Sequence, residues 1–296
     1  MDKTFGSMPT RELSGGAKIP VVGFGTFQIW PYEAQSAVEQ ALELGYRHID
    51  TAEAYLNEEQ VGAALAATGM AGKVFVTSKL RNASQGYDSA REALEGTLAA
   101  LRLDQLDLFL IHWPCPALGR YVDAWRALVK AREEGLVRSI GVSNFLVEHL
   151  ERLERETGVV PEVNQIESHP RFWQPELDAY CEQRGITVEA YSPLGHGKDI
   201  ASEPVDAAAR RLGVTAAQAV LRWHVQKGHV VLPKSTHAVR MRENLSLTGF
   251  TLTGAEVAAI DALDEPAGRV SGDPREFAAS QTKEDMLARG VVKLEP

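Results

Sequence analysis

Short runs of apolar and β-branched residues recur along this chain, and segments with helical spacing separate them. Two of the runs read VFVTS and LDLFLI, so they are apolar at most positions rather than at every second one. Strands buried on both faces have this composition, as in a parallel sheet covered by helices. We predict eight such strands, at Val21–Phe24, Arg47–Asp50, Val74–Ser78, Leu106–His112, Val137–Gly141, Glu162–Ile166, Thr187–Ala190 and Val230–Leu232.

The segments between these runs have the marks of helices. In Tyr32 to Leu44 the apolar residues fall on one stripe, and Gly45 follows as a stop signal. Thr215 and Gln218 have the spacing of a capping box, which predicts another helix start. Strand, helix and strand joined by short connections imply a parallel sheet.

Two architectures fit this alternation. Eight strands at intervals of roughly 25–30 residues match a (β/α)8 TIM barrel, which typically has about 250 residues. The alternative is an open doubly wound sheet, but no G-x-G-x-x-G phosphate loop follows the first strand. We therefore predict one barrel domain over residues 1–296. Ser14, Gly15 and Gly16 predict an N-terminal β-hairpin at the bottom of the barrel, and the tail after Gly268 is expected to be irregular.

Composition and charge exclude several classes of partner. The chain has 296 residues and a net charge of -9, so it lacks the basic field that nucleic-acid binding needs. Its strongest apolar stretch, Leu106 to Trp113, is far shorter than the ~20 residues of a membrane helix. Residues 1–20 lack a secretory signal, and 2 cysteines cannot form a disulfide framework. We expect a cytoplasmic protein with no nucleic-acid, membrane, metal or obligate protein partner.

Ionisable residues lie where successive predicted strands end. Asp50 ends the second strand, Lys79 the third and His112 the fourth, and Tyr55 lies in the loop after Asp50. In a barrel these ends open onto one face, where barrel enzymes keep their active sites. Each residue alone has an ordinary explanation, as a packing tyrosine, a helix cap, a solvated lysine or a buried histidine. Their joint placement favours a site without identifying its reaction.

The chemistry of this set can be argued from its charges. A tyrosine has a pKa of about 10, so it is a poor acid–base catalyst at neutral pH. The ammonium of Lys79 is expected to lower the pKa of Tyr55, and Asp50 to hold Lys79 charged and oriented. His112 is placed to hydrogen-bond a substrate oxygen. Such a set could protonate a carbonyl oxygen while a hydride reaches the carbon.

Three motifs around these residues resemble the aldo-keto reductase family. LGYRHIDTAEAYLNEEQVG (44–62) is similar to its signature around the catalytic Asp and Tyr, VTSKL (76–80) to the segment with its Lys, and LDLFLIHWP (106–114) to the segment with its His. The resemblance implies the catalytic tetrad Asp50, Tyr55, Lys79 and His112, with Tyr55 as general acid. It also implies NADPH-dependent reduction of a small aldehyde or ketone.

Four further motifs resemble the family's cofactor-binding segments: IGVSNF, VNQIESHP, YSPLG and LPKSTHAVRMREN. They imply that Ser143, Asn144 and Gln165 bind the nicotinamide carboxamide, that Tyr191 stacks on its ring, and that backbone from Ser192 through Leu194 to Gly195 lines the pyrophosphate. The last motif implies that Lys234, Ser235 and Arg240 hold the 2'-phosphate of NADPH, with Glu243 and Asn244 near the adenine.

The substrate is less constrained. The pattern looks most like bacterial 2,5-diketogluconate and methylglyoxal reductases, with Phe27, Trp30 and Trp113 as an apolar wall of the substrate pocket. One departure is Arg81, where many relatives have Trp. Two other functions stay open: a nicotinamide-binding regulatory or sensor subunit with little turnover, and a barrel aldolase in which Lys79 forms a Schiff base.

Overall fold

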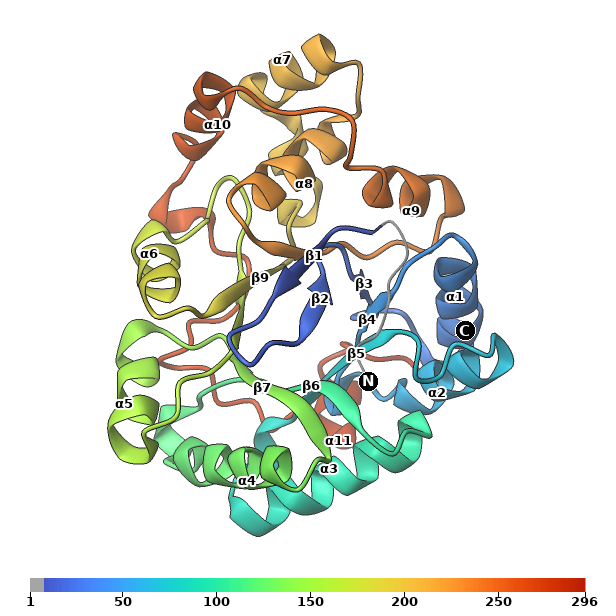
Figure 1. The fold of residues 1–296 in the computed structure, drawn as a ribbon, viewed down its shortest axis with the longest axis vertical. Helices are drawn as coiled ribbons and strands as arrows, with labels where there is room; N and C mark the ends of the chain where they lie inside the picture. Colours follow the sequence, from blue (N-terminus) through green and yellow to red (C-terminus); the bar gives the residue numbers. More distant parts are fainter. Residues whose placement is uncertain (1–7, 296) are drawn as a thin grey trace.

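The computed structural model describes residues 8–295, and its main sheet is a ring of parallel strands (Figure 1). The strands pair in chain order: β3 (Phe24–Gly25), β4 (His48–Asp50), β5 (Phe75–Leu80), β6 (Leu106–Ile111), β7 (Val137–Ser143), β8 (Val163–Glu167), β9 (Thr187–Tyr191) and β10 (Val230–Leu232). The ring closes where Val22 bridges Val231 and the Gly23 N–H donates to the Val231 carbonyl at 2.8 Å. The predicted (β/α)8 barrel is confirmed.

The predicted strands agree with the observed ones to within a few residues, and the first differs most. Only Phe24 of the predicted Val21–Phe24 belongs to β3. Val21 and Val22 instead contact the last strand, because the Val231 N–H donates to the Val21 carbonyl at 2.9 Å. The first run of apolar residues therefore serves as the seam of the barrel.

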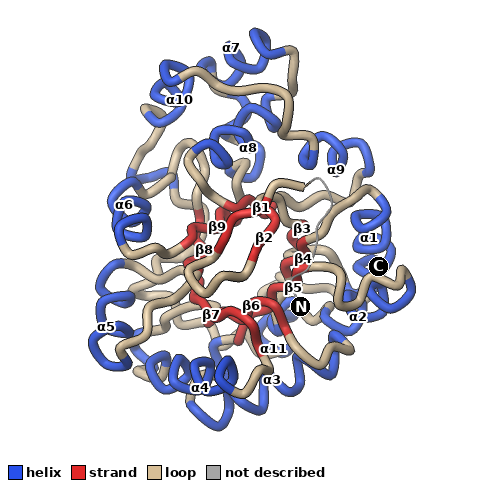
Figure 2. The backbone as a smooth tube through the Cα atoms, viewed as in Figure 1, coloured by secondary structure: helices blue, strands red, loops and turns tan. Residues whose placement is uncertain are grey.

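Helices surround the strands (Figure 2). The α1 helix buries the predicted apolar stripe and is followed by Gly45 at φ 108°. The predicted capping box begins α8, where the Gln218 N–H donates to Thr215 Oγ1 at 3.2 Å. The helices are α1 (Pro31–Glu43), α2 (Glu58–Ala67), α3 (Tyr87–Leu101), α4 (Tyr121–Glu133), α5 (Val147–Thr157), α6 (Pro175–Gln183), α7 (Glu203–Leu212), α8 (Ala216–Gln226), α9 (Ala238–Leu245), α10 (Gly254–Asp261) and α11 (Lys283–Ala288).

The predicted hairpin closes one end of the barrel. Antiparallel strands β1 (Thr10–Glu12) and β2 (Lys18–Pro20) lie across the barrel in Figure 1. The Arg11 guanidinium donates to the Gly228 carbonyl at 2.6 Å, which ties the hairpin to the start of β10. Its buried residues Leu13 and Ile19 form one apolar cluster with the lower barrel interior, namely Phe75, Leu108, Leu110, Val163 and Val230.

The C-terminal tail is more ordered than the sequence suggested. It is irregular over most of its length, but it contains the short helix α11, which Thr282 caps by accepting from the Asp285 N–H at 3.3 Å. Met286 of this helix packs in one apolar cluster with Tyr55, at the barrel end away from the hairpin. A helix of 6 residues with one buried side chain is too short to produce a periodic pattern.

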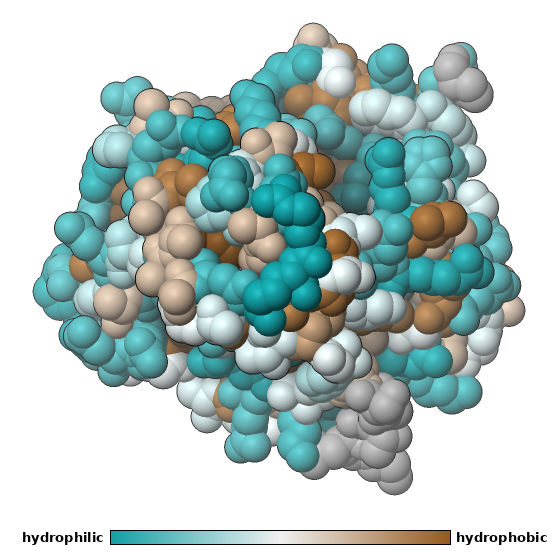
Figure 3. Space-filling model, turned by 90° about the horizontal axis from the view of Figure 1, so that it is seen from above, coloured by the Kyte–Doolittle hydropathy of each residue, from teal (hydrophilic) through white to brown (hydrophobic). Residues whose placement is uncertain are grey.

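The outer surface is mixed in character. On the face shown in Figure 3, hydrophobic residues are scattered among hydrophilic ones. Within residues 8–295, no helix has the length and apolar content needed to cross a membrane.

Candidate active site

The four predicted catalytic residues meet at the barrel end opposite the hairpin. Lys79 Nζ lies 2.6 Å from Asp50 Oδ1 and 3.4 Å from the Tyr55 hydroxyl. Tyr55 ends the 3₁₀ helix η1 (Glu53–Tyr55), and His112 directly follows β6. The rings of Tyr55 and His112 meet edge to face, with centroids 5.7 Å apart. The barrel therefore brings together residues that are separated by up to two strands.

Burial and charge set the protonation of this group. Burial alone would lower the pKa of Lys79, but the Asp50 carboxylate, and then Tyr55, raise it above its ordinary value. Burial lowers the pKa of His112 well below its ordinary value, and the charge of Lys79 adds to this. Lys79 is therefore an ammonium at neutral pH, and His112 is a neutral imidazole. Buried His112 Nδ1 has no hydrogen-bond partner among the described residues.

The pKa of Tyr55 differs from the expectation. The sequence argument predicted that Lys79 would lower it, but burial raises the pKa of Tyr55, and the ammonium opposes this only in part. Tyr55 is thus a neutral phenol that holds its proton at neutral pH. The prediction was wrong because the degree of burial depends on tertiary packing against the tail and the neighbouring loops.

Buried Asn57 fixes the loop that carries Tyr55. Its Nδ2 donates to the carbonyls of Thr26 at 3.1 Å and Ile29 at 3.0 Å, and its Oδ1 accepts from Thr51 Oγ1 at 2.9 Å. These bonds join the Tyr55 loop to the loop that carries Phe27. The sequence reasoning missed Asn57, although its position two residues after Tyr55 was a usable signal.

An ion pair beside Tyr55 accounts for Arg81. Arg81 Nε lies 2.9 Å from Glu53 Oε1, and the Arg81 backbone N–H donates to Glu53 Oε2 at 3.1 Å. Glu53 begins the 3₁₀ helix that ends at Tyr55, so the pair joins this helix to the end of β5. Arg81 therefore forms an ion pair within the chain that a tryptophan side chain at this position could not form.

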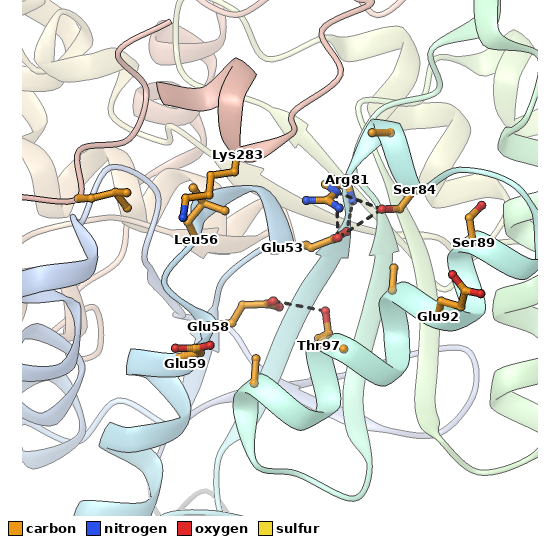
Figure 4. Close-up of a pocket in the computed structure, with 15 residues that line it drawn as sticks. Glu53, Leu56, Glu58, Glu59, Arg81, Ser84, Ser89, Glu92, Thr97 and Lys283 are labelled. Carbon is orange, nitrogen blue, oxygen red and sulfur yellow. Dashed lines mark hydrogen bonds and ion pairs between the residues drawn. The ribbon is translucent and has the colours of Figure 1, made fainter. Parts of the chain in front are cut away.

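A cavity of about 640 Å³ lies outside the barrel, between α2 and α3 and beside the tail (Figure 4). Glu53 and Glu58 line it, together with Thr97 and Lys283. Glu58 is buried and accepts from Ser78 Oγ at 2.5 Å, on the outward face of β5. None of the predicted catalytic or cofactor residues lines this cavity. The predicted active site at the barrel end is therefore separate from this cavity.

The residues predicted to bind nicotinamide adjoin the tetrad. Gln165 Nε2 donates to Asp50 Oδ2 at 2.8 Å, and Asn144 Nδ2 donates to the His112 carbonyl at 3.0 Å. Ser143 Oγ donates to the Gln165 carbonyl at 2.8 Å, and the Tyr191 hydroxyl lies 2.7 Å from Asn144 Oδ1. The ends of β7, β8 and β9 therefore bring these four side chains next to the predicted tetrad.

The predicted phosphate-binding segments follow the last two strands. Ser192 and Gly195 both have positive φ, at 47° and 54°, so the backbone after β9 turns sharply beside Leu194. After β10, Lys234 and Arg240 are exposed and form no ion pair with any described residue. Two cations without a partner around one turn have the chemistry of a site for a phosphate dianion. Ser235 and Asn244 of this segment are buried, and Glu243 is partly buried.

The predicted apolar wall is only partly assembled as expected. The Phe27 ring lies 5.1 Å from the Tyr55 ring. Trp113 stacks on Phe277 with centroids 3.9 Å apart, so the tail supplies an aromatic residue that the sequence reasoning missed. The Trp30 ring instead lies beside the tail, with Lys293 Nζ 5.8 Å from its centroid.

Glu167 anchors the tail beside Tyr191. Its carboxylate accepts from the backbone N–H groups of Val270 at 2.6 Å and Ser271 at 2.8 Å. Ser271 Oγ in turn lies 2.9 Å from the Tyr191 hydroxyl. On the other side of Glu167, His169 Nε2 is 3.1 Å away. The sequence reasoning missed the contacts of Ser271 because no motif around this residue predicts them.

Known proteins are similar to this chain in sequence and fold. A family model described as the aldo/keto reductase family matches residues 21–265. An aldo-keto reductase from Mycobacterium sp. (strain JLS) is 46% identical over 91% of this chain and 98% of the relative. Methylglyoxal reductase DkgA of Yersinia pestis is 44% identical over 92% of this chain and 99% of the relative. The crystal structure of a Gox0644 mutant in complex with NADPH has a TM-score of 0.89 and 43% identity, covering 92% of this chain and 100% of that one.

These matches agree with the motifs quoted from the sequence. The matched residues run from the seam of the barrel to beyond α10, so they include β4 to β10 and every segment that the motifs assigned to the cofactor. The chain belongs to the aldo/keto reductase family, a family of NADP(H)-dependent oxidoreductases.

Proposed function

We propose that this protein reduces small aldehydes and ketones to alcohols with NADPH, and that Tyr55 is the proton donor. The observation that carries the proposal is the position of Lys79, which is fully buried and lies between Asp50 at 2.6 Å and the Tyr55 hydroxyl at 3.4 Å. Burying a charged lysine away from solvent costs free energy. A structural role alone is therefore a poor explanation for the burial of Lys79.

The residues would divide the work as follows. NADPH, when bound, supplies the hydride that the carbonyl carbon accepts. Tyr55 donates its proton to the carbonyl oxygen, and the Lys79 ammonium stabilises the phenolate that this leaves. Because His112 is a neutral imidazole, it can donate a hydrogen bond to the same oxygen without competing as an acid. Preorganised donors at a developing alkoxide supply a large part of the rate enhancement in such sites.

The cofactor would be held at two places. Gln165, Asn144 and Ser143 face the nicotinamide carboxamide, and Tyr191 its ring. Lys234 and Arg240 hold the 2'-phosphate, and this is supported by their exposure and lack of an ion-pair partner among the described residues. The Ser192 to Gly195 turn would line the pyrophosphate.

The substrate we propose is a small 2-oxoaldehyde of the methylglyoxal type. The relative named methylglyoxal reductase supports this choice. Two aromatic groups on the proposed substrate side also support it: the Phe27 ring, which lies beside the Tyr55 ring, and the stacked rings of Trp113 and Phe277.

The test is the loss of NADPH absorbance with methylglyoxal, 2,5-diketogluconate, an aromatic aldehyde and a ketosteroid. We expect the highest kcat/KM with methylglyoxal and the lowest with the ketosteroid. Tight NADPH binding without reduction of any carbonyl would favour the sensor alternative instead. Borohydride trapping of a carbonyl on Lys79 without use of NADPH would favour the aldolase.

A further inference from the structure

A buried carboxyl group that the proposed mechanism does not use lies beside the catalytic residues. Glu189 is on β9, has no exposed surface, and pairs in register with Gln165 on β8. Gln165 Nε2 donates to Glu189 Oε2 at 3.0 Å as well as to Asp50 Oδ2 at 2.8 Å. Gln165 thus connects Glu189 to the residue that holds Lys79.

These two contacts determine which way the Gln165 amide faces. A side-chain amide has two N–H donors on its nitrogen and acceptor positions on its oxygen. Asp50 presents a carboxylate oxygen and Glu189 presents Oε2 as an acceptor, so the Gln165 nitrogen faces both and both of its protons are used. Gln165 Oε1 is left pointing elsewhere, and no described residue donates to it.

The other groups around Glu189 do not compete for Gln165. His48 Nε2 lies 3.8 Å from Glu189 Oε1, and burial lowers the pKa of His48 to about 3, so that ring is neutral. Lys79 is engaged by Asp50. Burial raises the pKa of Glu189 to about 8, so a neutral acid whose carbonyl oxygen accepts from Gln165 predominates at pH 7. A glutamine at this position would retain such an acceptor.

We infer that Glu189 is a positioning residue: by binding the Gln165 amide nitrogen, it directs Gln165 Oε1 to accept from the N–H of the nicotinamide carboxamide. This rests on the proposed function, in which Gln165 faces that carboxamide. Glu189 would therefore help the protein to distinguish a carboxamide from a group of the same shape that lacks an N–H donor.

The test measures the dissociation constants of NADPH and of its 3-acetylpyridine analogue, in which a methyl group replaces the carboxamide nitrogen. Quenching of intrinsic fluorescence reports both. We expect the intact protein to prefer NADPH, and Glu189→Leu to reduce that preference by about tenfold, the effect of releasing one buried hydrogen bond. Glu189→Gln should keep the preference, because it keeps the acceptor.

Thr187→Val is the matched control. Thr187 lies on the same strand two residues earlier, is itself buried and accepts from Arg11 Nε at 3.2 Å, so this variant also loses a hydrogen bond of β9, partly buried and away from Gln165. It should keep the preference for NADPH. Glu189→Asp withdraws the carboxyl by one methylene and removes little volume, so it should fold and reproduce the loss seen with Glu189→Leu.

The outcomes separate the inference from the proposed function. An unchanged preference in Glu189→Asp and Glu189→Leu, in a protein whose intact form reduces carbonyls, overturns the role of Glu189 alone. A loss of preference in Thr187→Val as large as that in the Glu189 variants also overturns it, because the effect is then a general one. An intact chain that neither binds NADPH nor reduces any carbonyl overturns both.

Discussion

The two halves of the barrel interior are built from the same strands but have opposite chemistry. Near the hairpin, inward-facing Phe75 and Leu108 belong to an apolar cluster that the hairpin completes. At the other end, inward-facing Asp50, Lys79 and Gln165 form a buried hydrogen-bonded network. On β5 the change from Phe75 to Lys79 takes 4 residues.

This difference shows how stability and chemistry are divided. Burying apolar area stabilises the fold, at about 25 cal/mol per Å². A buried ion pair adds little on balance, because removing both charges from water offsets their attraction. The half of the interior near the hairpin, here the lower half, therefore contributes stability. The half at the other end, here the upper half, is explained by the reaction we propose. Substitutions in the two halves should have different consequences.

The largest effect is expected in the upper half. Lys79→Met removes the group that stabilises the Tyr55 phenolate, so kcat should fall by about 10²- to 10⁴-fold. It also leaves Asp50 buried without its partner, which should lower the free energy of unfolding by about 3–5 kcal/mol. Steady-state kinetics and urea denaturation measure the two effects.

The control for this variant is the double substitution Lys79→Met with Asp50→Asn. It removes the unpaired charge, so stability should recover in part while kcat stays low. Recovery of kcat together with stability would show that Lys79 acts only through the fold.

In the lower half, Leu108→Ala should do the reverse. Leu108 is fully buried in the cluster beneath the network, so the cavity should lower the free energy of unfolding by about 2–5 kcal/mol. The kcat of the folded protein should stay within about twofold. The substitution should change the activation free energy by far less than the ~1.36 kcal/mol that corresponds to a tenfold change in rate. A kcat lowered tenfold, with stability unchanged, would contradict the division between the halves.

We also expect the cofactor-binding site of the upper half to include the turn after β10. Replacing Lys234 and Arg240 with alanine removes two charge-assisted contacts, so the dissociation constant of NADPH should rise by about 10- to 100-fold. That of NADH, which lacks the 2'-phosphate, should change little. Fluorescence titration with each cofactor measures the ratio. Equal losses for both would place the 2'-phosphate elsewhere.

The smallest expected effect is a pH dependence of stability. Burial alone would lower the pKa of His169, but Asp199 and Glu167 raise it to about 9, above the ordinary 6.5. A raised pKa in the folded state gives a contribution that is complete below about pH 6.5 and is lost as pH rises through about 9. The difference in unfolding free energy between the intact protein and His169→Gln should therefore shrink from pH 6 to pH 9.5.

Leu108→Ala is again the control, since an apolar cavity does not titrate. Its difference from the intact protein should stay constant over the same pH range. A His169→Gln difference that is also constant would contradict the raised pKa.

The sequence predicted the barrel and the meeting of the tetrad for a physical reason. Residues at the ends of parallel strands share one face, so Asp50, Lys79 and His112 could be placed together without knowing any contact. The pKa direction of Tyr55 could not be predicted, because it depends on how deeply the tail buries the phenol. Nor could Phe277, which reaches Trp113 from more than half the chain away through a segment without periodicity.

The most direct test of the account replaces Tyr55 with phenylalanine and measures single-turnover reduction of methylglyoxal beside NADPH binding. The ring stays in its cluster, and only the proton donor is lost. We predict that hydride transfer slows by about 10²- to 10⁴-fold while the NADPH dissociation constant stays within a few-fold. A rate close to that of the intact protein would show that another group delivers the proton, and the assignment of Tyr55 would be wrong.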